Sequence, residues 1–172
     1  MLRVVLLISQ SDWRDEELLE TQEELKKAGI VVDVAAEKLG ISKGKFGSEI
    51  NIDLKYNEIE ANKYDAIIFI GGPGVFNYLH NNVWHGLANK FYSQGKLVAA
   101  ICLSPAVLAF AGLLNGKKAT VSASASDYLQ SSGAQYLDQD VVNDGQIITA
   151  NGPASTFPFS QSIITYLKKL NK

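Results

Sequence analysis

Cysteine, histidine and positive charge are all scarce in this chain, and each scarcity excludes a class of protein. Of the 172 residues, one is cysteine and two are histidine. A single cysteine excludes an internal disulfide and is typical of a cytoplasmic protein. One cysteine and two histidines are also too few for a zinc cage built from these residue types. The formal net charge is −2, whereas nucleic-acid-binding proteins typically carry an excess of basic residues. We therefore predict no nucleic-acid partner, no metal and no other cofactor.

Long apolar segments and linkers are scarce as well. Residues 97–114 form a run of 18 residues without a charge, which is the length of a membrane span. Ser104 and Pro105 interrupt this run, and its alanines are only weakly apolar. The apolar N-terminus continues into acidic sequence without the small-residue cleavage site of a secretory signal peptide. We expect one domain over residues 1–172, located in the cytoplasm and not at a membrane.

Short apolar segments alternate with helical segments along the chain. Strands are predicted over residues 2–9, 30–36, 66–70, 97–101 and 119–122, and helices over 15–28, 83–93, 105–114, 127–132 and 157–170. Alternation of this kind is typical of a parallel sheet that carries helices on both faces. Residues 40–54 and 140–150 are predicted to form hairpins, the first at the sheet edge. The predicted fold class is α/β: a doubly wound, mostly parallel sheet between helices, with a small antiparallel hairpin.

The single cysteine, Cys102, lies where the strand over residues 97–101 meets the helix that begins near Pro105. A strand that enters a helix directly makes a tight turn, as in the nucleophile elbow. The turn residue then points over the helix N-terminus, where backbone N–H groups and the helix dipole lower a thiol pKa. We predict that Cys102 is a reactive nucleophile. The alternative is an inert buried thiol, since cysteine is among the most buried residue types.

Several polar or small residues follow predicted strand ends, where ligands bind in doubly wound sheets. We expect one crevice to be lined by Ser9, Gly71, Cys102, Ser122 and Asn151. On local sequence alone, a serine nucleophile at Ser122 is improbable without a base, and Asn151 is typical of a turn.

Two further segments are candidates for the chemistry around Cys102. The loop over residues 71–74 can place a backbone N–H opposite the sulfur and bind an oxyanion together with the N–H of Leu103. Its alternative is a tight turn that uses the conformational freedom of glycine. Glu17, at the start of the first helix, reaches the sulfur if the first strand and the Cys102 strand are neighbours, and can then exchange a proton with it. Spacing alone favours a surface acid at this position.

Four segments occur in the order seen in the ThiJ/PfpI superfamily: DEELLETQEELKKAGIVVDV, AIIFIGGPG, KLVAAICLSPAVLAFAGLLNGKKAT and ITANGPAS. The chain resembles this superfamily over nearly its whole length. The resemblance implies a flavodoxin-like fold and a homodimer or larger homo-oligomer. It also implies a reactive elbow cysteine at Cys102, a partner carboxylate at Glu17, and backbone N–H groups from Gly72 and Leu103 that hold an anion or oxyanion.

The chain departs from both main branches of the superfamily. Leu103 stands where the peptidase branch has a histidine, so peptidase or amidase activity is disfavoured. Ser122 stands near the position of a histidine in the deglycase-like branch, and Asn151 replaces an arginine that precedes Gly-Pro. This second replacement removes one partner for a substrate carboxylate.

The resemblance implies a cysteine-dependent hydrolase or lyase of small carbonyl compounds, of the glyoxalase or deglycase type. In the first alternative, the protein is a non-catalytic oxidative-stress sensor or chaperone-like protein with an oxidisable cysteine. The sulfinate of Cys102 would then be stabilised by Glu17 and the same N–H groups. A scaffold that has lost the family chemistry is a further alternative.

Overall fold

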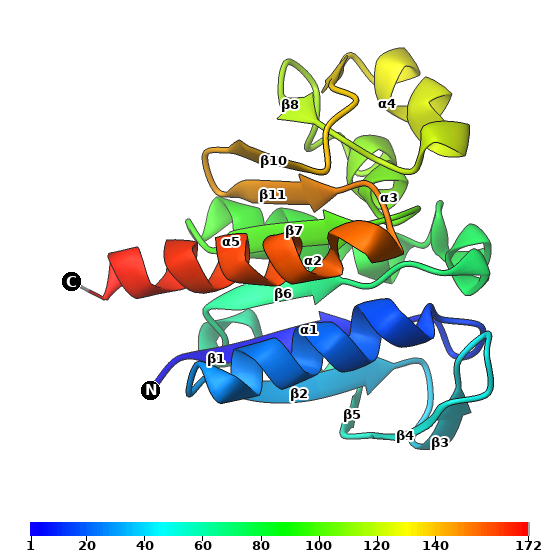
Figure 1. The fold of residues 1–172 in the computed structure, drawn as a ribbon, viewed down its shortest axis with the longest axis vertical. Helices are drawn as coiled ribbons and strands as arrows, with labels where there is room; N and C mark the ends of the chain where they lie inside the picture. Colours follow the sequence, from blue (N-terminus) through cyan, green and yellow to red (C-terminus); the bar gives the residue numbers. More distant parts are fainter. Residues whose placement is uncertain (172) are drawn as a thin grey trace.

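The computed structural model describes residues 1–171, and its centre is a seven-stranded sheet (Figure 1). The strand order is β10-β11-β7-β6-β1-β2-β5. All neighbouring strands are parallel except β10 and β11, which pair antiparallel. The strands are β1 (Arg3–Leu7), β2 (Val31–Ala36), β5 (Leu54–Lys55), β6 (Ala66–Phe69), β7 (Leu97–Ile101), β10 (Val141–Asp144) and β11 (Ile147–Ala150). The predicted, mostly parallel, doubly wound α/β sheet is confirmed.

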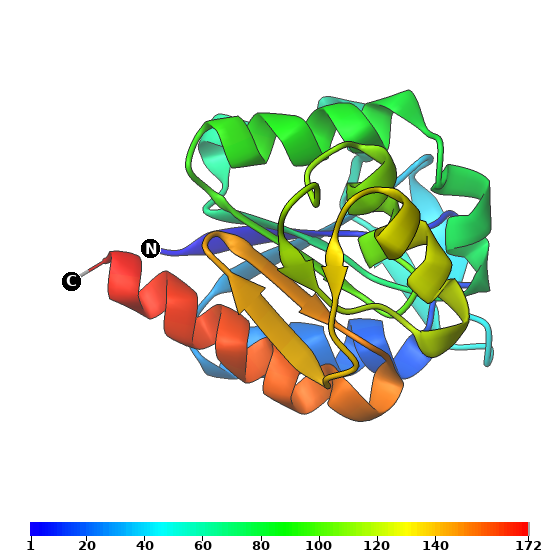
Figure 2. The ribbon, with the colours of Figure 1, turned by 90° about the horizontal axis from the view of Figure 1, so that it is seen from above.

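Helices cover both faces of the sheet and bury it. Figure 2 shows α2 (Asn82–Ser93) on one side and α1 (Asp15–Lys27) with α5 (Thr156–Leu170) on the other. The shorter helices α3 (Pro105–Phe110) and α4 (Ser126–Ser131) pack against one another. Because both faces are covered, all residues of β6, β7 and β11 are buried. This double burial explains why β6 and β7 read as unbroken apolar runs in the sequence. β11 contains one polar residue, the buried Thr149.

Alternate residues of each central strand enter two separate cores. Val5 and Leu7 of β1 belong to the core beneath α2 and α3. Val4 and Leu6 belong to the core beneath α1 and α5. Because side chains alternate across a strand, a shift of one residue would exchange the two sets, so the packing specifies the register. Because β1, β6 and β7 run parallel, their carboxyl ends lie at the same edge of the sheet.

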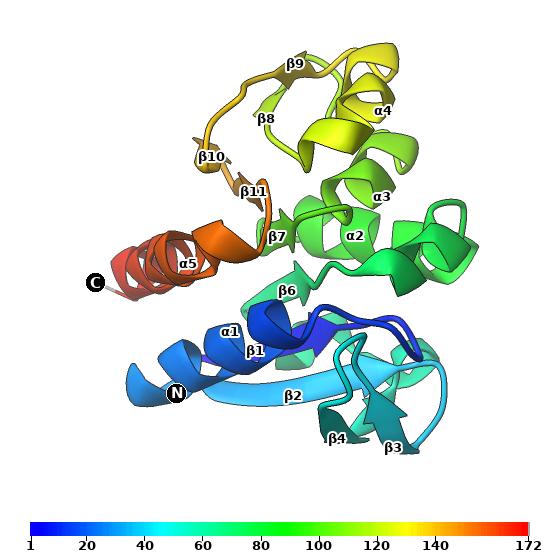
Figure 3. The same cartoon turned by 45° about the vertical axis from the view of Figure 1, so that its right-hand side comes forward.

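Two small sheets lie at opposite ends of the main sheet (Figure 3). The predicted first hairpin is present as β3 (Gly40–Lys43) and β4 (Glu49–Ile52), which pair antiparallel. It forms its own sheet, and the edge position predicted for it belongs to β5, which pairs with β2. The strand predicted over residues 119–122 is wrong in extent and place. Its counterpart β8 (Lys118–Ala119) pairs with β9 (Gln135–Tyr136) outside the main sheet.

Five 3-10 helices complete the described elements: η1 (Tyr56–Glu58), η2 (Ala61–Lys63), η3 (Pro73–Tyr78), η4 (Ala123–Ala125) and η5 (Pro153–Ser155). In the described part of the chain, no helix combines the length and the apolar character that a membrane span requires.

Candidate active site

Cys102 lies directly after β7, and its backbone is held in an uncommon conformation. Its φ of +64° is in the left-handed region, which costs a residue with a side chain about 1–2 kcal/mol. Two hydrogen bonds hold the turn in place. The Cys102 N–H donates to the Ala150 carbonyl over 2.9 Å, and the Ser122 N–H donates to the Cys102 carbonyl over 2.8 Å. This geometry aims the partly exposed thiol away from the strand, as an elbow nucleophile requires.

The loop after β6 approaches the thiol with its backbone. Gly72 has a φ of +115°, and a Cβ added there would lie 2.5 Å from the backbone nitrogen of Arg14. Only glycine fits this position, because both the conformation and the close approach exclude a side chain. The backbone N–H groups of Gly72 and Leu103 interact with the Cys102 thiol and lower its pKa. Two backbone N–H donors thus face the sulfur, and that they hold an anion or oxyanion stays a prediction.

Glu17, in the first turn of α1, is completely buried beside this loop. Its Oε2 accepts a hydrogen bond from the Gly71 N–H over 2.9 Å, and its Oε1 is buried without a hydrogen-bond partner among residues 1–171. Burial raises the pKa of Glu17 from 4.5 to about 7, although the Gly71 N–H and the Cys102 thiol oppose this rise. The surface role that spacing alone favours for Glu17 is therefore wrong.

The route by which Glu17 reaches the sulfur differs from the predicted one. β6 lies between β1 and β7, so the first strand and the Cys102 strand are not neighbours. Glu17 spans this gap because Gly71 has no side chain. A Cβ at residue 71 would lie 2.6 Å from Glu17 Oε2 and 2.5 Å from Cys102 Cβ. Gly71 thus lies between the carboxyl and the cysteine and allows them to meet.

The ionisation of the Cys102 thiol and that of the Glu17 carboxyl are coupled. Burial raises the pKa of the Cys102 thiol, and the negative charge of Glu17 raises it further, against the lowering by the two N–H groups. The lowered thiol pKa that the elbow position predicts is thus reversed, first by burial and then by the charge of Glu17. Protonating Glu17 removes its charge and supplies an O–H donor for the sulfur. Two adjacent negative charges repel, so the pair favours a single charge between them at neutral pH.

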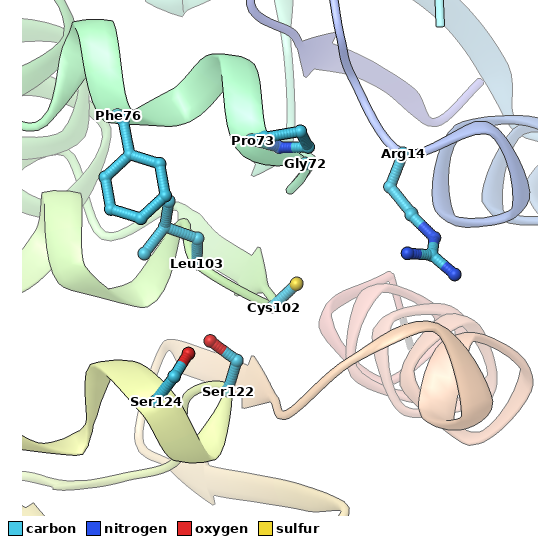
Figure 4. A pocket seen from close by; sticks show the side chains of 8 residues that line it. All are labelled: Arg14, Gly72, Pro73, Phe76, Cys102, Leu103, Ser122 and Ser124. Atoms are coloured by element: carbon cyan, nitrogen blue, oxygen red, sulfur yellow. The ribbon is translucent and has the colours of Figure 1, made fainter. Parts of the chain in front are cut away.

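A cavity of about 220 Å³ opens above Cys102. Its wall contains four of the predicted site residues, Gly72, Cys102, Leu103 and Ser122, and also Arg14, Pro73, Phe76 and Ser124 (Figure 4). This volume lies below the roughly 300–1,000 Å³ of drug-sized ligand pockets, so the cavity suits a compound of a few non-hydrogen atoms.

Three predicted crevice residues are not in the cavity wall. Gly71 lies beneath it, with its N–H on Glu17. Asn151 uses its side-chain oxygen to accept a hydrogen bond from Ser155 Oγ over 2.6 Å. Ser9 is buried and donates through Oγ to the Ser11 carbonyl over 2.8 Å. All three follow strands as predicted, but their side chains or backbone groups serve the local structure rather than the cavity.

Arg14 is the main site residue that the sequence analysis missed. Its backbone N–H donates to the Gly71 carbonyl over 2.9 Å, and it caps α1 without a side-chain hydrogen bond. The only local signal was an arginine directly before the acidic first turn of a helix, a place where the dipole favours acids. An unfavourably placed charge of this kind can indicate a function.

No group of three or more histidine, cysteine, aspartate or glutamate side chains among residues 1–171 is arranged to hold a metal ion. The groups that surround the cavity with reactive or charged atoms are the thiol, the protonatable carboxyl, the two N–H groups and the arginine. This set can add a sulfur nucleophile to a carbonyl carbon, stabilise the resulting oxyanion and transfer a proton.

The fold and the site define a class: doubly wound α/β proteins with a cysteine at a strand-to-helix elbow. The profile of the DJ-1/PfpI family matches residues 3–166, and the chain belongs to this family. It is 39% identical to an uncharacterised protein of Methanocaldococcus jannaschii, over 99% of this chain and 84% of the relative. It is 32% identical to a deglycase of Pyrococcus abyssi, over 95% of this chain and 99% of the relative.

Further similarities extend beyond the archaea. The chain is 28% identical to a glutathione-independent glyoxalase of Caenorhabditis elegans, over 95% of this chain and 88% of the relative. The crystal structure of a ThiJ/PfpI domain protein from Brachyspira murdochii superposes with a TM-score of 0.96. The two chains are 29% identical, and the superposition covers 97% of this chain and 96% of the other. The resemblance predicted from the four sequence segments is thus confirmed.

Proposed function

We propose that the protein is a cysteine-dependent enzyme of the glyoxalase or deglycase type that acts on small carbonyl compounds. The observation that carries the proposal is the position of the Cys102 thiol. It lies at the base of a small cavity, between the N–H groups of Gly72 and Leu103 and beside the buried carboxyl of Glu17. Family members named as a deglycase and a glyoxalase support the class of reaction.

The first step uses Cys102 as the nucleophile. The carboxylate of Glu17 takes the proton of the Cys102 thiol as the sulfur forms a bond to the aldehyde carbon of a substrate such as methylglyoxal, and the C=O π electrons move to the oxygen. The N–H groups of Gly72 and Leu103 stabilise this oxyanion, and Glu17 provides its proton. A carboxyl with a pKa of about 7 suits this role, because it exists in both forms at neutral pH.

The second step needs no external oxidant. The carboxylate of Glu17 removes the proton from the sulfur-bearing carbon, and a proton is returned to the neighbouring ketone carbon. The former aldehyde carbon becomes a thioester while the ketone becomes an alcohol. Water then cleaves the thioester, which frees Cys102 and releases a 2-hydroxy acid. The net reaction adds one water to methylglyoxal and conserves electrons. An adduct of the aldehyde with an amine or thiol is a substrate when the same sulfur attack releases that group.

The test is turnover of methylglyoxal by the purified protein, measured as formation of lactate. Wild type is expected to form lactate and Cys102→Ser is expected to form none. A matched control is Ser124→Ala, since Ser124 lies in the same cavity wall but has no assigned role in the steps above. Equal rates in wild type and Cys102→Ser would refute the proposal. Oxidation of Cys102 to a sulfinate without any turnover would instead favour the oxidative-stress role.

A further inference from the structure

The cavity wall is charged on one side of Cys102 and apolar on the other. Of the eight residues that line it, Arg14 is the one that carries a charge. Figure 4 shows its guanidinium on one side of the Cys102 sulfur and the apolar side chains of Phe76 and Leu103 on the other. A molecule bound over the thiol therefore meets a cation in one direction and apolar surface in the opposite direction.

Three contacts hold Arg14 in this place. Its backbone N–H donates to the Gly71 carbonyl, in the same loop that passes Cys102. Its guanidinium carbon lies 4.7 Å from the centre of the Phe46 ring, in the β3–β4 hairpin. Its Nε donates to Glu16 Oε2 over 2.8 Å. The hairpin is itself fixed to the start of α1, because the buried Asp15 carboxylate accepts the N–H groups of Phe46 and Ser48.

The guanidinium retains donor capacity beyond Glu16. It has five N–H donors in a planar fork. Glu16 takes the Nε donor and receives a longer contact of 3.4 Å from Nη2. Within the described part of the chain, no hydrogen bond from Nη1 to another residue is formed. Glu16 is half exposed, whereas the Arg14 side chain is 29% exposed, so the pairing orients the arginine without enclosing it.

We infer that Arg14 favours the reversible addition to Cys102 of carbonyl compounds with a carboxylate beside the reacting carbon. Such a compound stops at the addition and competes with the substrate, because its neighbouring carbon is a carboxylate and not a ketone that could take up the proton. The inference rests on the proposed function, because it takes Cys102 as the group that attacks this carbon. The carboxylate of this ligand lies against the guanidinium, which recognises carboxylates with paired N–H donors. The other substituent of the reacting carbon faces Phe76 and Leu103, and is hydrogen or a small apolar group.

A pair of alkylating reagents tests this inference without any turnover. Iodoacetate and iodoacetamide both react with a thiolate by displacement of iodide, and the first carries a carboxylate one bond from the reacting carbon. We expect the ratio of their rate constants on Cys102 to fall about fivefold in Arg14→Gln. This is the upper range for one partly exposed charge interaction. Any change of the thiol pKa in the variant affects both reagents equally and cancels in the ratio.

The chain offers a matched control, because Arg3 is its only other arginine. Arg3 is paired with Asp33 near the opposite, amino end of β1, so Arg3→Gln removes the same charge far from the cavity. Arg3→Gln should leave the ratio unchanged, and Glu16→Gln should raise it because a competing carboxylate is removed. An unchanged ratio in Arg14→Gln, or an equal fall in Arg3→Gln, would overturn the inference.

A second measurement uses reversible protection of Cys102 from iodoacetamide. Glyoxylate carries a carboxylate and methylglyoxal does not, and both can add to the thiolate. Glyoxylate should protect wild type at about fivefold lower concentration than Arg14→Gln, whereas methylglyoxal should protect both alike. Equal protection of both proteins by glyoxylate would count against the inference. Failure of the proposed function appears elsewhere, as absence of product in the turnover assay, so the two failures are distinguishable.

Discussion

Replacing Glu17 by glutamine should stabilise the protein at pH 8 and have little effect at pH 4.5. Glutamine keeps an oxygen that can accept the Gly71 N–H, but it cannot ionise. In wild type, the pKa of Glu17 is raised by burial to about 7, so the folded state holds a proton that the unfolded chain releases near pH 4.5. This contribution to stability is complete below pH 4.5 and is lost as the pH rises through 7.

The expected size follows from the two pKa values. The difference between 4.5 and about 7 costs the folded protein about 1.4 kcal/mol per pH unit, or roughly 3 kcal/mol in total. The cost that comes from Glu17 is fully present once the pH lies above its folded-state pKa of about 7. The Glu17→Gln variant escapes this cost. Its free energy of unfolding should exceed that of wild type by about 2–3 kcal/mol at pH 8.

The assay is urea unfolding of both proteins at several values between pH 4.5 and 8. The matched control is Glu16→Gln at the next residue, whose carboxyl has its pKa lowered by the hydrogen bond from Arg14. Stability from a lowered pKa is present at high pH, so Glu16→Gln should be neutral or slightly destabilising at pH 8. If wild type and Glu17→Gln gave parallel stability curves over this range, Glu17 would titrate normally. The argument from burial would then be refuted.

Three other outcomes follow from the site geometry. Gly71→Ala should lower the free energy of unfolding by more than about 2 kcal/mol and abolish turnover, because the new Cβ meets Cys102 Cβ at 2.5 Å. Gly86→Ala in α2, where a Cβ meets nothing within 4 Å, should stabilise by up to about 1 kcal/mol. Cys102→Gly should be at least as stable as Cys102→Ala in urea, since the φ of +64° penalises any side chain, and a clearly more stable alanine variant would contradict the strain. Denatured casein should stay intact by gel electrophoresis, since Leu103 cannot act as a base; cleavage that Cys102→Ser abolishes would contradict this.

Local sequence was sufficient for most of the fold. Apolar runs identified β1, β6 and β7, because strands buried on both faces carry few polar residues. The helices α1, α2 and α5 were identified by their stripes of apolar residues and by the glycine that follows α1 and α2. Elements of two residues were missed or misplaced, as for β8, because a pair of residues has no periodicity to detect.

The start of α1 departs from local preference for a related reason. Ser11 and Asp12 are residue types that favour a cap, yet Asp12 has a φ of +60° and α1 begins after Arg14. The Asp12 N–H donates to the Lys43 carbonyl, and the Gly74 N–H donates to the Asp12 carbonyl. Partners far away in sequence thus override the local preference at this position.

By itself, the sequence determined where the elbow cysteine lies and what surrounds it along the chain. A cysteine between a buried strand and a proline-led helix can be recognised locally, because the turn is made by consecutive residues. Only the tertiary structure decided the chemical environment of that cysteine. Glu17 is buried beside Cys102 because Gly71, from a third strand, leaves room between them, and Arg14 enters the cavity through contacts with Gly71 and Phe46. A pKa depends on desolvation and on charges a few ångströms away, and residues far apart in sequence supply both.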